Sequence, residues 1–213
     1  MIVAIDGPAG SGKGTIANLL SKKYNLVNID TGATYRCLAL KCLRNNLTDE
    51  KDIIELSKDI DIKFDTFNNV YLDGENVTDL IRSKEVTSIV SPISSIVEVR
   101  KNMVSLQRKL ASTNDVVMEG RDITTVVFPN ADYKFYLDAS LEERVNRRIL
   151  QNKEKNIDMS YEEVLESIKA RDYNDSHKEV GSLIRTNDQI YIDSTNKTIE
   201  EVLNEISKFI EVK

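Results

Sequence analysis

The stretch Ala4-Ile5-Asp6-Gly7-Pro8-Ala9-Gly10-Ser11-Gly12-Lys13-Gly14-Thr15 decides the fold of this chain. The apolar residues 1–3 before it predict a short buried strand. Apolar residues at positions 16, 19, 20 and 24 after it predict one face of a helix. Four glycines and a lysine therefore lie at a strand-to-helix junction, and this context distinguishes a phosphate-binding loop from a merely flexible turn.

The loop has the chemistry that a nucleoside triphosphate requires. Its glycines allow several backbone N–H groups to converge on one anion, and the following helix adds the positive end of its dipole. Lys13 supplies a point charge for the outer phosphates. The loop matches G-x-x-x-x-G-K-[ST] with one departure, because Gly14 follows the lysine and the hydroxyl group comes one residue later, at Thr15.

The composition is that of a globular protein, with 213 residues of which 40% are hydrophobic and 30% charged. The net charge of −6 provides no overall positive field for nucleic acid or an anionic membrane. No apolar run approaches the ~18 residues of a spanning helix, and the phosphate loop begins too early for a signal peptide. Cys37 and Cys42 are expected to be buried thiols in a reducing cytoplasm. We expect a cytoplasmic monomer without nucleic-acid or membrane partners.

Four further short segments rich in apolar residues predict strands, at residues 26–30, 115–119, 133–137 and 189–193. Helical patterns separate them. Alternating strands and helices predict an α/β fold with a five-stranded, doubly wound parallel sheet. The nearly all-apolar segment 115–119 is expected to be central in this sheet.

Residues 59–95 interrupt the alternation of strands and helices. Alternating residues at 61–65, and a hairpin at 69–77 with an Asp-Gly turn, predict a small antiparallel sheet. Short helices at 78–81 and 84–90 are expected to follow, broken by Pro92. We interpret 59–95 as an insertion into a core formed by residues 1–58 and 96–213.

Two predicted helices after residue 140 are expected to form a lid. Ser140 with Glu143, and Ser160 with Glu163, have the spacing of capping boxes. With their polar connection they indicate a lid at about 147–165. Its Arg147 and Arg148 are candidates to contact a phosphate, and the alternative is that they are solvated helix residues.

Several charged residues are expected at the carboxyl edge of the sheet, where such folds bind ligands. Arg121 and Asp122 follow the central strand. Arg36 lies in the first turn of a helix, where a cation opposes the dipole, so it is either an anion clamp or a surface arginine. Glu119 is either a strand-end acid or an outer partner of Mg²⁺. Arg100 lies off the apolar stripe of a long helix that Ser94 or Ser95 is expected to begin, and is expected to be free to reach a ligand.

The chain resembles the bacterial cytidylate kinases, a family of P-loop nucleoside monophosphate kinases, over essentially its whole length. The resemblance rests on six motifs: Gly7 to Thr15, Asp30-Thr31-Gly32-Ala33-Thr34-Tyr35-Arg36, Gly120-Arg121-Asp122, Thr125-Val126-Val127-Phe128-Pro129, Arg171-Asp172 and Asp193-Ser194-Thr195. It implies transfer of the γ-phosphoryl group of ATP to CMP or dCMP, with the insertion 59–95 as the monophosphate-binding domain.

The resemblance also implies residue roles. ATP would be bound by Gly7, Pro8, Ala9, Gly10, Ser11, Gly12, Lys13, Gly14 and Thr15. The acceptor nucleotide would be bound by Thr31, Arg36, Ser91, Arg100, Arg121, Asp122, Arg171, Asp175 and Lys178. The family usually has arginine where Lys178 stands, and lysine lacks the bidentate fork. Gly181-Ser182-Leu183 replaces the usual Ala-Pro-Leu.

The chemistry expected of these residues is positioning and charge neutralisation. Lys13, Arg121, Arg147 and Arg148 would offset charge on the transferring group, and the anionic acceptor needs no general base. Mg²⁺ would accompany ATP, with Thr15, directly or through water, as its protein oxygen and Asp30 as a second candidate.

Two other functions remain open from the sequence alone. One is a P-loop kinase acting on another small molecule, such as AMP, shikimate or dephospho-coenzyme A. The other is an ATP-binding switch or sensor.

Overall fold

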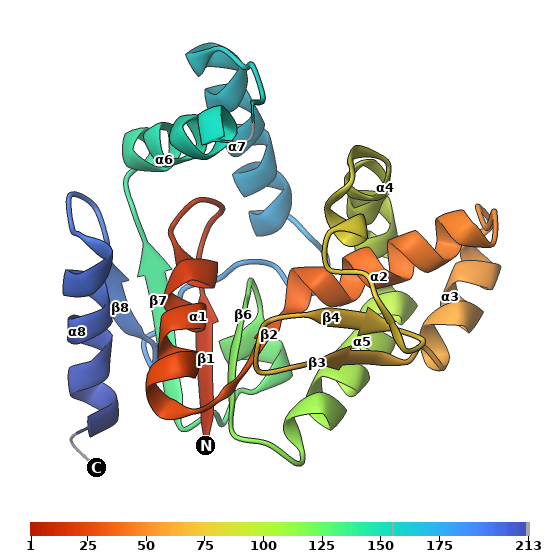
Figure 1. Cartoon of the computed structure of the whole chain (residues 1–213), viewed down its shortest axis with the longest axis horizontal. Helices are drawn as coiled ribbons and strands as arrows, with labels where there is room; N and C mark the ends of the chain where they lie inside the picture. The colour runs from red at the N-terminus through yellow and green to blue at the C-terminus, as the bar shows by residue number, and fades with distance from the viewer. Residues whose placement is uncertain (155, 212–213) are drawn as a thin grey trace.

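The computed structural model describes residues 1–154 and 156–211, and its centre is one parallel sheet. The strands are β1 (Ile2–Asp6), β2 (Val27–Asp30), β6 (Val116–Gly120), β7 (Tyr133–Asp138) and β8 (Ile190–Asp193). They pair in the order β2-β6-β1-β7-β8, and every pair is parallel (Figure 1). This arrangement confirms the predicted five-stranded sheet.

Strand β1 is longer than the sequence suggested. Ala4, Ile5 and Asp6 belong to the strand rather than to the loop, which begins at Gly7. Val3 and Ile5 pack in one apolar layer and Ala4 in the other. Because both faces of the strand are covered, its side chains are apolar at successive positions, and the continuous apolar run hides where the strand ends.

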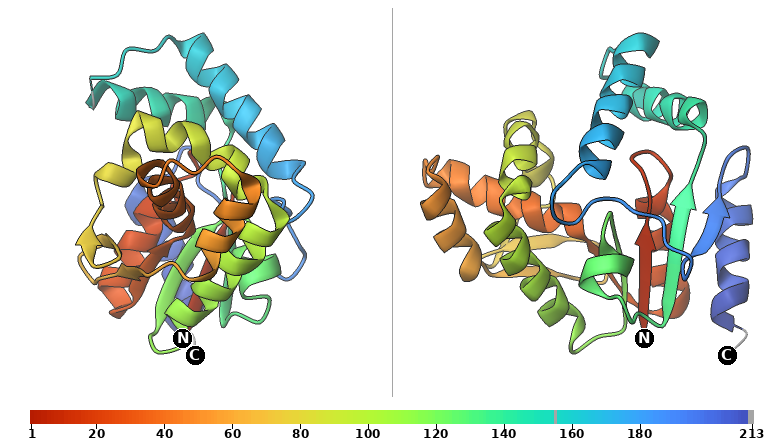
Figure 2. Two further views of the ribbon diagram at one scale, coloured as in Figure 1. Left: turned by 90° about the vertical axis from the view of Figure 1, so that its right-hand side faces the viewer. Right: turned by 180° about the vertical axis from the view of Figure 1, so that it is seen from behind.

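Helices cover both faces of the sheet (Figures 1 and 2). One layer contains apolar residues of α1 and α8, and the other contains apolar residues of the end of α5 and a π-helical turn at Ile123–Val127. The sequence did not predict this turn. The α-helices are α1 (Lys13–Tyr24), α2 (Thr31–Arg44), α3 (Glu50–Lys58), α4 (Lys84–Ser95), α5 (Val97–Ala111), α6 (Leu141–Glu154), α7 (Tyr161–Ser176) and α8 (Ile199–Glu211).

The segment after α3 forms the predicted small antiparallel sheet, β3 (Ile62–Phe64), β4 (Val70–Leu72) and β5 (Glu75–Asn76), with the hairpin turning at Asp73-Gly74. A 3-10 turn at Leu80–Arg82 follows. The expected break at Pro92 is wrong, because Pro92 lies inside α4. Pro92 and Ser88, one helical turn before it, are both exposed residues, so the proline lies on the solvent side of the helix, where the lost hydrogen bond costs least.

The expected helix start at Ser94 or Ser95 is also wrong. Both residues end α4, and α5 begins at Val97. One apolar cluster combines residues of α2, α3, α4 and α5 with residues of β3 and β4. The boundaries proposed at 59 and 95 stay a prediction, since this cluster continues across both of them. Lys155, Val212 and Lys213, which belong to the predicted lid and core, lie outside the described residues.

Helices α6 and α7 stand over the carboxyl edge of the sheet (Figure 1). Their apolar side chains form a cluster of their own around Val145, Val164 and Ile168. The capping box of Ser160 and Glu163 is present. The one predicted at Ser140 is only half formed, because the Glu143 carboxylate pairs with Arg147 at 2.9 Å instead.

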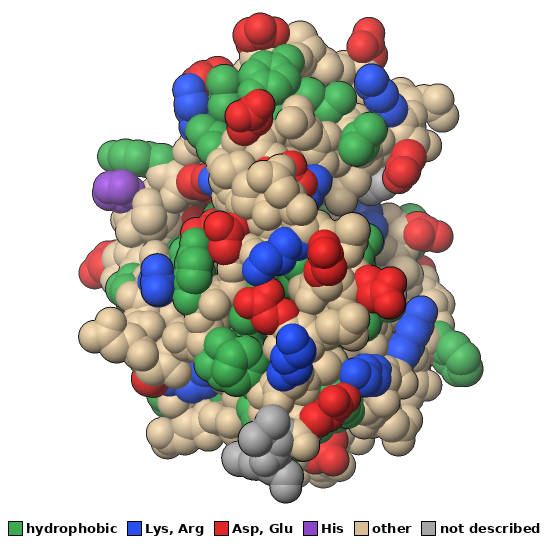
Figure 3. Space-filling model, turned by 90° about the vertical axis from the view of Figure 1, so that its left-hand side faces the viewer, with side chains coloured by type: hydrophobic (Ala, Val, Ile, Leu, Met, Phe, Trp, Pro, Cys, Tyr) green, Lys and Arg blue, Asp and Glu red, His purple; other side chains and the backbone are tan. Residues whose placement is uncertain are grey.

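Among the described residues no helix is long and apolar enough to cross a membrane. Acidic and basic side chains are intermixed on the face that carries α8 and β8, so this face presents no extended positive surface (Figure 3).

Candidate active site

A cleft of about 740 Å³ lies between the phosphate loop, the carboxyl ends of β2 and β6, helix α4 and the two helices α6 and α7. It brings together residues that are far apart in the sequence. The predicted site residues that line it are Ala9, Gly10, Gly12, Lys13, Gly14, Thr15, Asp30, Thr31, Arg36, Ser91, Arg100, Arg121, Asp122, Arg148, Arg171, Asp175 and Lys178.

Four of the predicted residues, Gly7, Pro8, Ser11 and Arg147, are not among the described residues that line the cleft. Gly7 lies where the loop passes β7, and a Cβ atom there would lie 2.0 Å from the carbonyl oxygen of Leu137. Only glycine fits this approach. Gly7 therefore allows the loop to pack against β7 and does not face the cleft.

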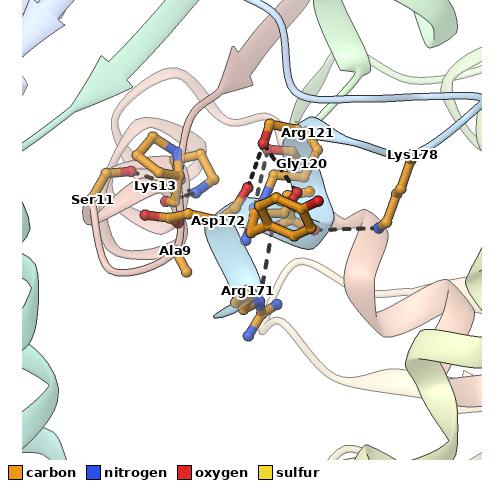
Figure 4. Close-up of polar contacts among 12 residues, drawn as sticks. Ala9, Ser11, Lys13, Gly120, Arg121, Arg171, Asp172 and Lys178 are labelled. Atoms are coloured by element: carbon orange, nitrogen blue, oxygen red, sulfur yellow. Dashed lines mark hydrogen bonds and ion pairs between the residues drawn. The ribbon is translucent and has the colours of Figure 1, made fainter. Parts of the chain in front are cut away.

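Lys13 lies buried inside the phosphate loop (Figure 4). Its Nζ donates hydrogen bonds to the Pro8 carbonyl at 2.8 Å and to Ser11 Oγ at 3.4 Å. Burial first, and then the positive charge of Arg121, lower the pKa of Lys13 to about 7. A phosphate group at the loop would favour the charged ammonium form of Lys13.

Arg36 and Asp30 form a pair at the edge of the cleft. Arg36 Nη2 donates to Asp30 Oδ2 at 2.6 Å, and Asp30 Oδ1 accepts from the backbone N–H of Ala33, which caps α2. Burial disfavours the charged carboxylate, but Arg36 outweighs this effect and the pKa of Asp30 is lowered. The pair explains why a cation is tolerated in the first turn of a helix.

Glu119 lies beside Asp30, since the two residues are register partners on β6 and β2. A Cβ atom placed on Gly14 would lie 3.4 Å from Glu119 Oε1, so this carboxylate reaches the phosphate loop. Burial and then the Asp30 carboxylate raise the pKa of Glu119. Among the described residues no group of three or more Asp, Glu, His or Cys could hold a metal by itself.

Asp175 forms ion pairs with three basic side chains on the α7 side of the cleft. Its Oδ2 accepts from Arg121 Nε at 2.6 Å and lies 3.9 Å from Arg171 Nε, and its Oδ1 accepts from Lys178 Nζ at 3.3 Å. Figure 4 shows Arg121, Arg171 and Lys178 opposite the loop that holds Lys13. Among the residues that the structure describes, the cleft thus has Lys13 on the loop side and several cations on the other side.

Arg100 is buried rather than free, which corrects the sequence prediction. Its Nη2 donates to Asp122 Oδ2 at 2.5 Å and its Nη1 to the Ser94 carbonyl at 3.1 Å. The Tyr35 ring lies 5.5 Å from the guanidinium. The three partners of Arg100 come from α2, from α4 and from the residues after β6, so a helical pattern could not predict them.

Arg147 binds the backbone behind the phosphate loop instead of facing the cleft. Its guanidinium donates to Ser194 O at 2.7 Å, Ser194 Oγ at 3.0 Å and Ser11 O at 3.4 Å. Arg144, which the sequence did not single out, makes similar contacts with Ala9 O at 3.1 Å and with Asp172 at 2.7 Å. These arginines join α6 to the loop, whereas Arg148 lines the cleft.

Asp6 is a second residue that the sequence reasoning missed. It is fully buried, and its carboxylate accepts from the backbone N–H groups of Ile123 and Thr124, both at 2.8 Å, and from the Thr124 hydroxyl at 2.6 Å. These bonds fix the turn directly after Arg121 and Asp122. The signal in the sequence that could have pointed to this role was a single carboxylate, Asp6, at the end of the apolar run 2–5.

Further residues line the cleft without having been predicted, including Tyr35, Arg82, Gln151 and Asn174. Arg82 is exposed just before α4, and its charge contributes to the lowered pKa of Asp30. The cleft is therefore more basic near Asp30 and Arg36 than the sequence analysis implied.

Comparison with solved structures agrees with the fold. An uncharacterised protein from Eubacterium ventriosum superposes over 100% of this chain and 99% of its own, with a TM-score of 0.56 and 14% identity. A shikimate kinase from Bacteroides thetaiotaomicron covers 99% of this chain and 98% of its own, with a TM-score of 0.51 and 12% identity. At these identities the likeness concerns the fold alone.

Sequence comparison is more specific. The family model described as cytidylate kinase matches residues 3–212. A cytidylate kinase of Clostridioides difficile is 47% identical over 208 residues, which are 97% of this chain and 96% of that protein. A cytidylate kinase of Fusobacterium nucleatum is 48% identical over 215 residues, covering 99% of this chain and 97% of that protein. A phosphate loop facing a basic cleft, together with this match over almost the whole length, places the chain in the cytidylate kinase family.

Proposed function

We propose that this protein transfers the γ-phosphoryl group of ATP to CMP or dCMP, giving ADP and CDP or dCDP. The observation that carries the proposal is the arrangement of the cleft. A triphosphate loop with Lys13 lies on one side, and a cluster with Arg36, Arg121 and Arg171 lies on the other. Two anionic substrates placed there would meet between the two sets of cations.

The transfer itself needs no general base, because the acceptor phosphate is already anionic. Lys13 and Arg121 would neutralise charge on the transferring group, and Arg148 lies on α6, from which it can approach the same group. Arg147 would not contact the transferring group and would instead hold the loop in place through its hydrogen bonds to Ser11 and Ser194. Closing α6 and α7 over the cleft would exclude water and so suppress hydrolysis of ATP.

The residues beside the loop fit a magnesium ion carried by ATP. The Thr15 hydroxyl is exposed in the cleft, and the Glu119 carboxylate reaches Gly14, so both offer the oxygen donors that Mg²⁺ prefers. Asp30 fits less well, because Arg36 and the Ala33 N–H already occupy its oxygens. The ion would neutralise phosphate charge during transfer.

The acceptor base would be read by Ser91, Arg100 and Asp122. Asp122 Oδ2 is occupied by Arg100, which leaves Oδ1 to accept from the exocyclic amine of cytosine. Uracil has an acceptor at that position, so it would leave a buried carboxylate facing an oxygen. Asp175 and Arg171 would contact the ribose, and residues 59–95 would form the monophosphate-binding part.

Two coarser expectations are also part of the proposal. Cys37 and Cys42 are buried free thiols, which suits a reducing cytoplasm. We infer a monomer, and sedimentation equilibrium at micromolar concentration tests it, because a mass of about twice 24.2 kDa would contradict it.

The decisive experiment is a coupled assay of ADP production with each acceptor in turn. We expect CMP and dCMP to be used well and UMP poorly, and AMP, GMP and shikimate not to be used. A kcat/KM for UMP equal to that for CMP would refute the roles of Ser91 and Asp122. Activity with shikimate instead of CMP would refute the proposed acceptor class.

A matched pair of variants on α2 tests the acceptor phosphate site. Arg36→Ala removes a charge from the cleft, whereas Arg44→Ala removes an exposed charge that pairs with Glu75 outside it. Loss of a charge-assisted hydrogen bond predicts a kcat/KM for CMP lower by about 10- to 100-fold in Arg36→Ala. Equal kinetics for the two variants would show that Arg36 does not bind the acceptor.

A further inference from the structure

The segment 177–189 connects α7 to β8, and we call it the strap. It crosses the sheet on the face opposite α1 (Figures 1 and 2). Gly181 is buried in the strap and has a φ of +71°. A Cβ atom at this position would lie 2.1 Å from Arg100 Nη2 and 2.3 Å from Asp122 Oδ2. The strap backbone therefore packs directly against the Arg100–Asp122 pair.

Apart from the side on which it lines the cleft, the pair is closely surrounded. Arg100 and Asp122 are only 4% and 6% exposed. The Tyr35 ring lies 5.5 Å from the Arg100 guanidinium, and the Ser94 carbonyl accepts a hydrogen bond from Nη1 at 3.1 Å. An atom added at position 181 would displace the pair itself unless the strap could move away.

Hydrogen bonds hold the strap at its middle and at its β8 end. Leu183 N donates to the Asp175 carbonyl at 2.7 Å, which ties it to the last turn of α7. Gln189 is buried and donates to the Thr124 hydroxyl, which in turn donates to Asp6 at 2.6 Å. The strap is thus fastened to the same turn that follows Asp122, and it cannot retreat without breaking buried hydrogen bonds.

We propose that Gly181 is a positioning residue for the acceptor base. Because it lacks a side chain, the strap closes on Arg100 and Asp122 and fixes where their free atoms meet the cytosine ring. Selection of cytosine over uracil then depends on a backbone contact as well as on the two side chains. The inference rests on the proposed role of this pair in reading the base.

Two substitutions at Gly181 and two at a control position test this. Gly181→Ala adds the Cβ atom, and Gly181→Asn adds it in a residue that tolerates a left-handed backbone. Gly74→Ala and Gly74→Asn are the controls, because Gly74 has a φ of +85° and a Cβ there would meet nothing within 4 Å. The kinetic constants are measured with CMP, UMP and ATP.

We expect both Gly181 variants to raise the KM for CMP and to lower the CMP/UMP ratio of kcat/KM by about tenfold, the effect of losing one well-placed hydrogen bond. The KM for ATP should stay within about twofold, which a general loss of structure would not produce. Gly181 variants that keep the wild-type ratio overturn the inference. So does failure of both to fold while Gly74→Asn folds, because the role would then be structural.

Asp122→Asn separates this inference from the proposed function. If it leaves the CMP/UMP ratio unchanged, the base-reading role of the pair is wrong. If it lowers the ratio and the Gly181 variants do not, only the positioning role of Gly181 is wrong.

Discussion

Asp6 immediately precedes the phosphate loop, yet its carboxylate serves the turn that follows Arg121 and Asp122. We predict that Asp6→Asn lowers the free energy of unfolding and weakens binding of the acceptor more than that of ATP. In the wild type Oδ1 accepts from Ile123 N, and Oδ2 accepts from Thr124 N and Oγ1. The asparagine side chain has an oxygen acceptor at only one of these two positions and an NH₂ donor at the other.

The magnitude follows from the bonds that remain. With the amide oxygen at the Oδ2 position, the buried N–H of Ile123 loses its acceptor, which costs about 1–3 kcal/mol. The two bonds to Thr124 lose their charge assistance, roughly another 1 kcal/mol together. A total of about 3 kcal/mol, with an m-value of about 2.5 kcal/mol/M, lowers the urea midpoint by about 1 M.

The assays are urea unfolding and steady-state kinetics with CMP and ATP varied in turn. Asp132→Asn is the control. Asp132 accepts one exposed hydrogen bond, at 2.7 Å, from the backbone N–H of Ile2, which lies on β1 as Asp6 does. It should change the stability by less than about 0.5 kcal/mol. If Asp6→Asn behaves like Asp132→Asn, or if it raises the KM for ATP and not for CMP, the assignment of Asp6 to the acceptor side is refuted.

Three further outcomes are expected. Lys13, with a pKa of about 7, is about nine-tenths neutral at pH 8 and charged at pH 6, so ATP binding should take up nearly one proton at pH 8 and few at pH 6. Calorimetry in buffers of different ionisation enthalpy measures this uptake, and equal uptake at both pH values would contradict it. Arg121 holds the pKa of Asp175 below its usual value despite burial, so this group contributes stability above pH ~4 that is lost as the pH falls through its folded pKa. Asp175→Asn should therefore reduce the difference between the free energies of unfolding at pH 7 and at pH 3, measured with urea. An unchanged difference would show that the Arg121–Asp175 ion pair does not stabilise the fold. Ser160→Ala removes the cap of α7 and should weaken protection of its first amides from hydrogen exchange by about 1 kcal/mol, with α8 unaffected.

The sequence predicted those parts of the molecule that local patterns determine. The phosphate loop, the five strands and the Asp73-Gly74 hairpin each have a signal within a few residues. Two of the errors concern Pro92 and the helix start near Ser94, where exposure and the neighbouring helix decided between two locally acceptable structures.

The site was harder to predict, because its side chains pair across long distances in the sequence. The residues of the cleft were largely named, but not the pairs Arg100–Asp122 and Arg121–Asp175 or the buried role of Asp6. The sequence showed Gly181-Ser182 in place of the usual Ala-Pro, but it did not show what this change does to the structure. Alanine before proline is restricted to an extended backbone, so an Ala-Pro sequence does not suit the φ of +71° that Gly181 adopts.

The two sides of the cleft are joined to the body by different kinds of contact. Helix α4, on the side proposed for the acceptor, shares one apolar cluster with α2, α3 and α5, so moving it as a unit would break hydrophobic packing. Helices α6 and α7 have a small core of their own, and Arg144 and Arg147 attach them to backbone carbonyls of the loop. Such polar joints can exchange with water at little net cost. If α6 and α7 open and close as proposed, their opening should therefore occur at denaturant concentrations that leave the packing of α2, α3, α4 and α5 intact, which makes these helices an exchangeable module for engineering.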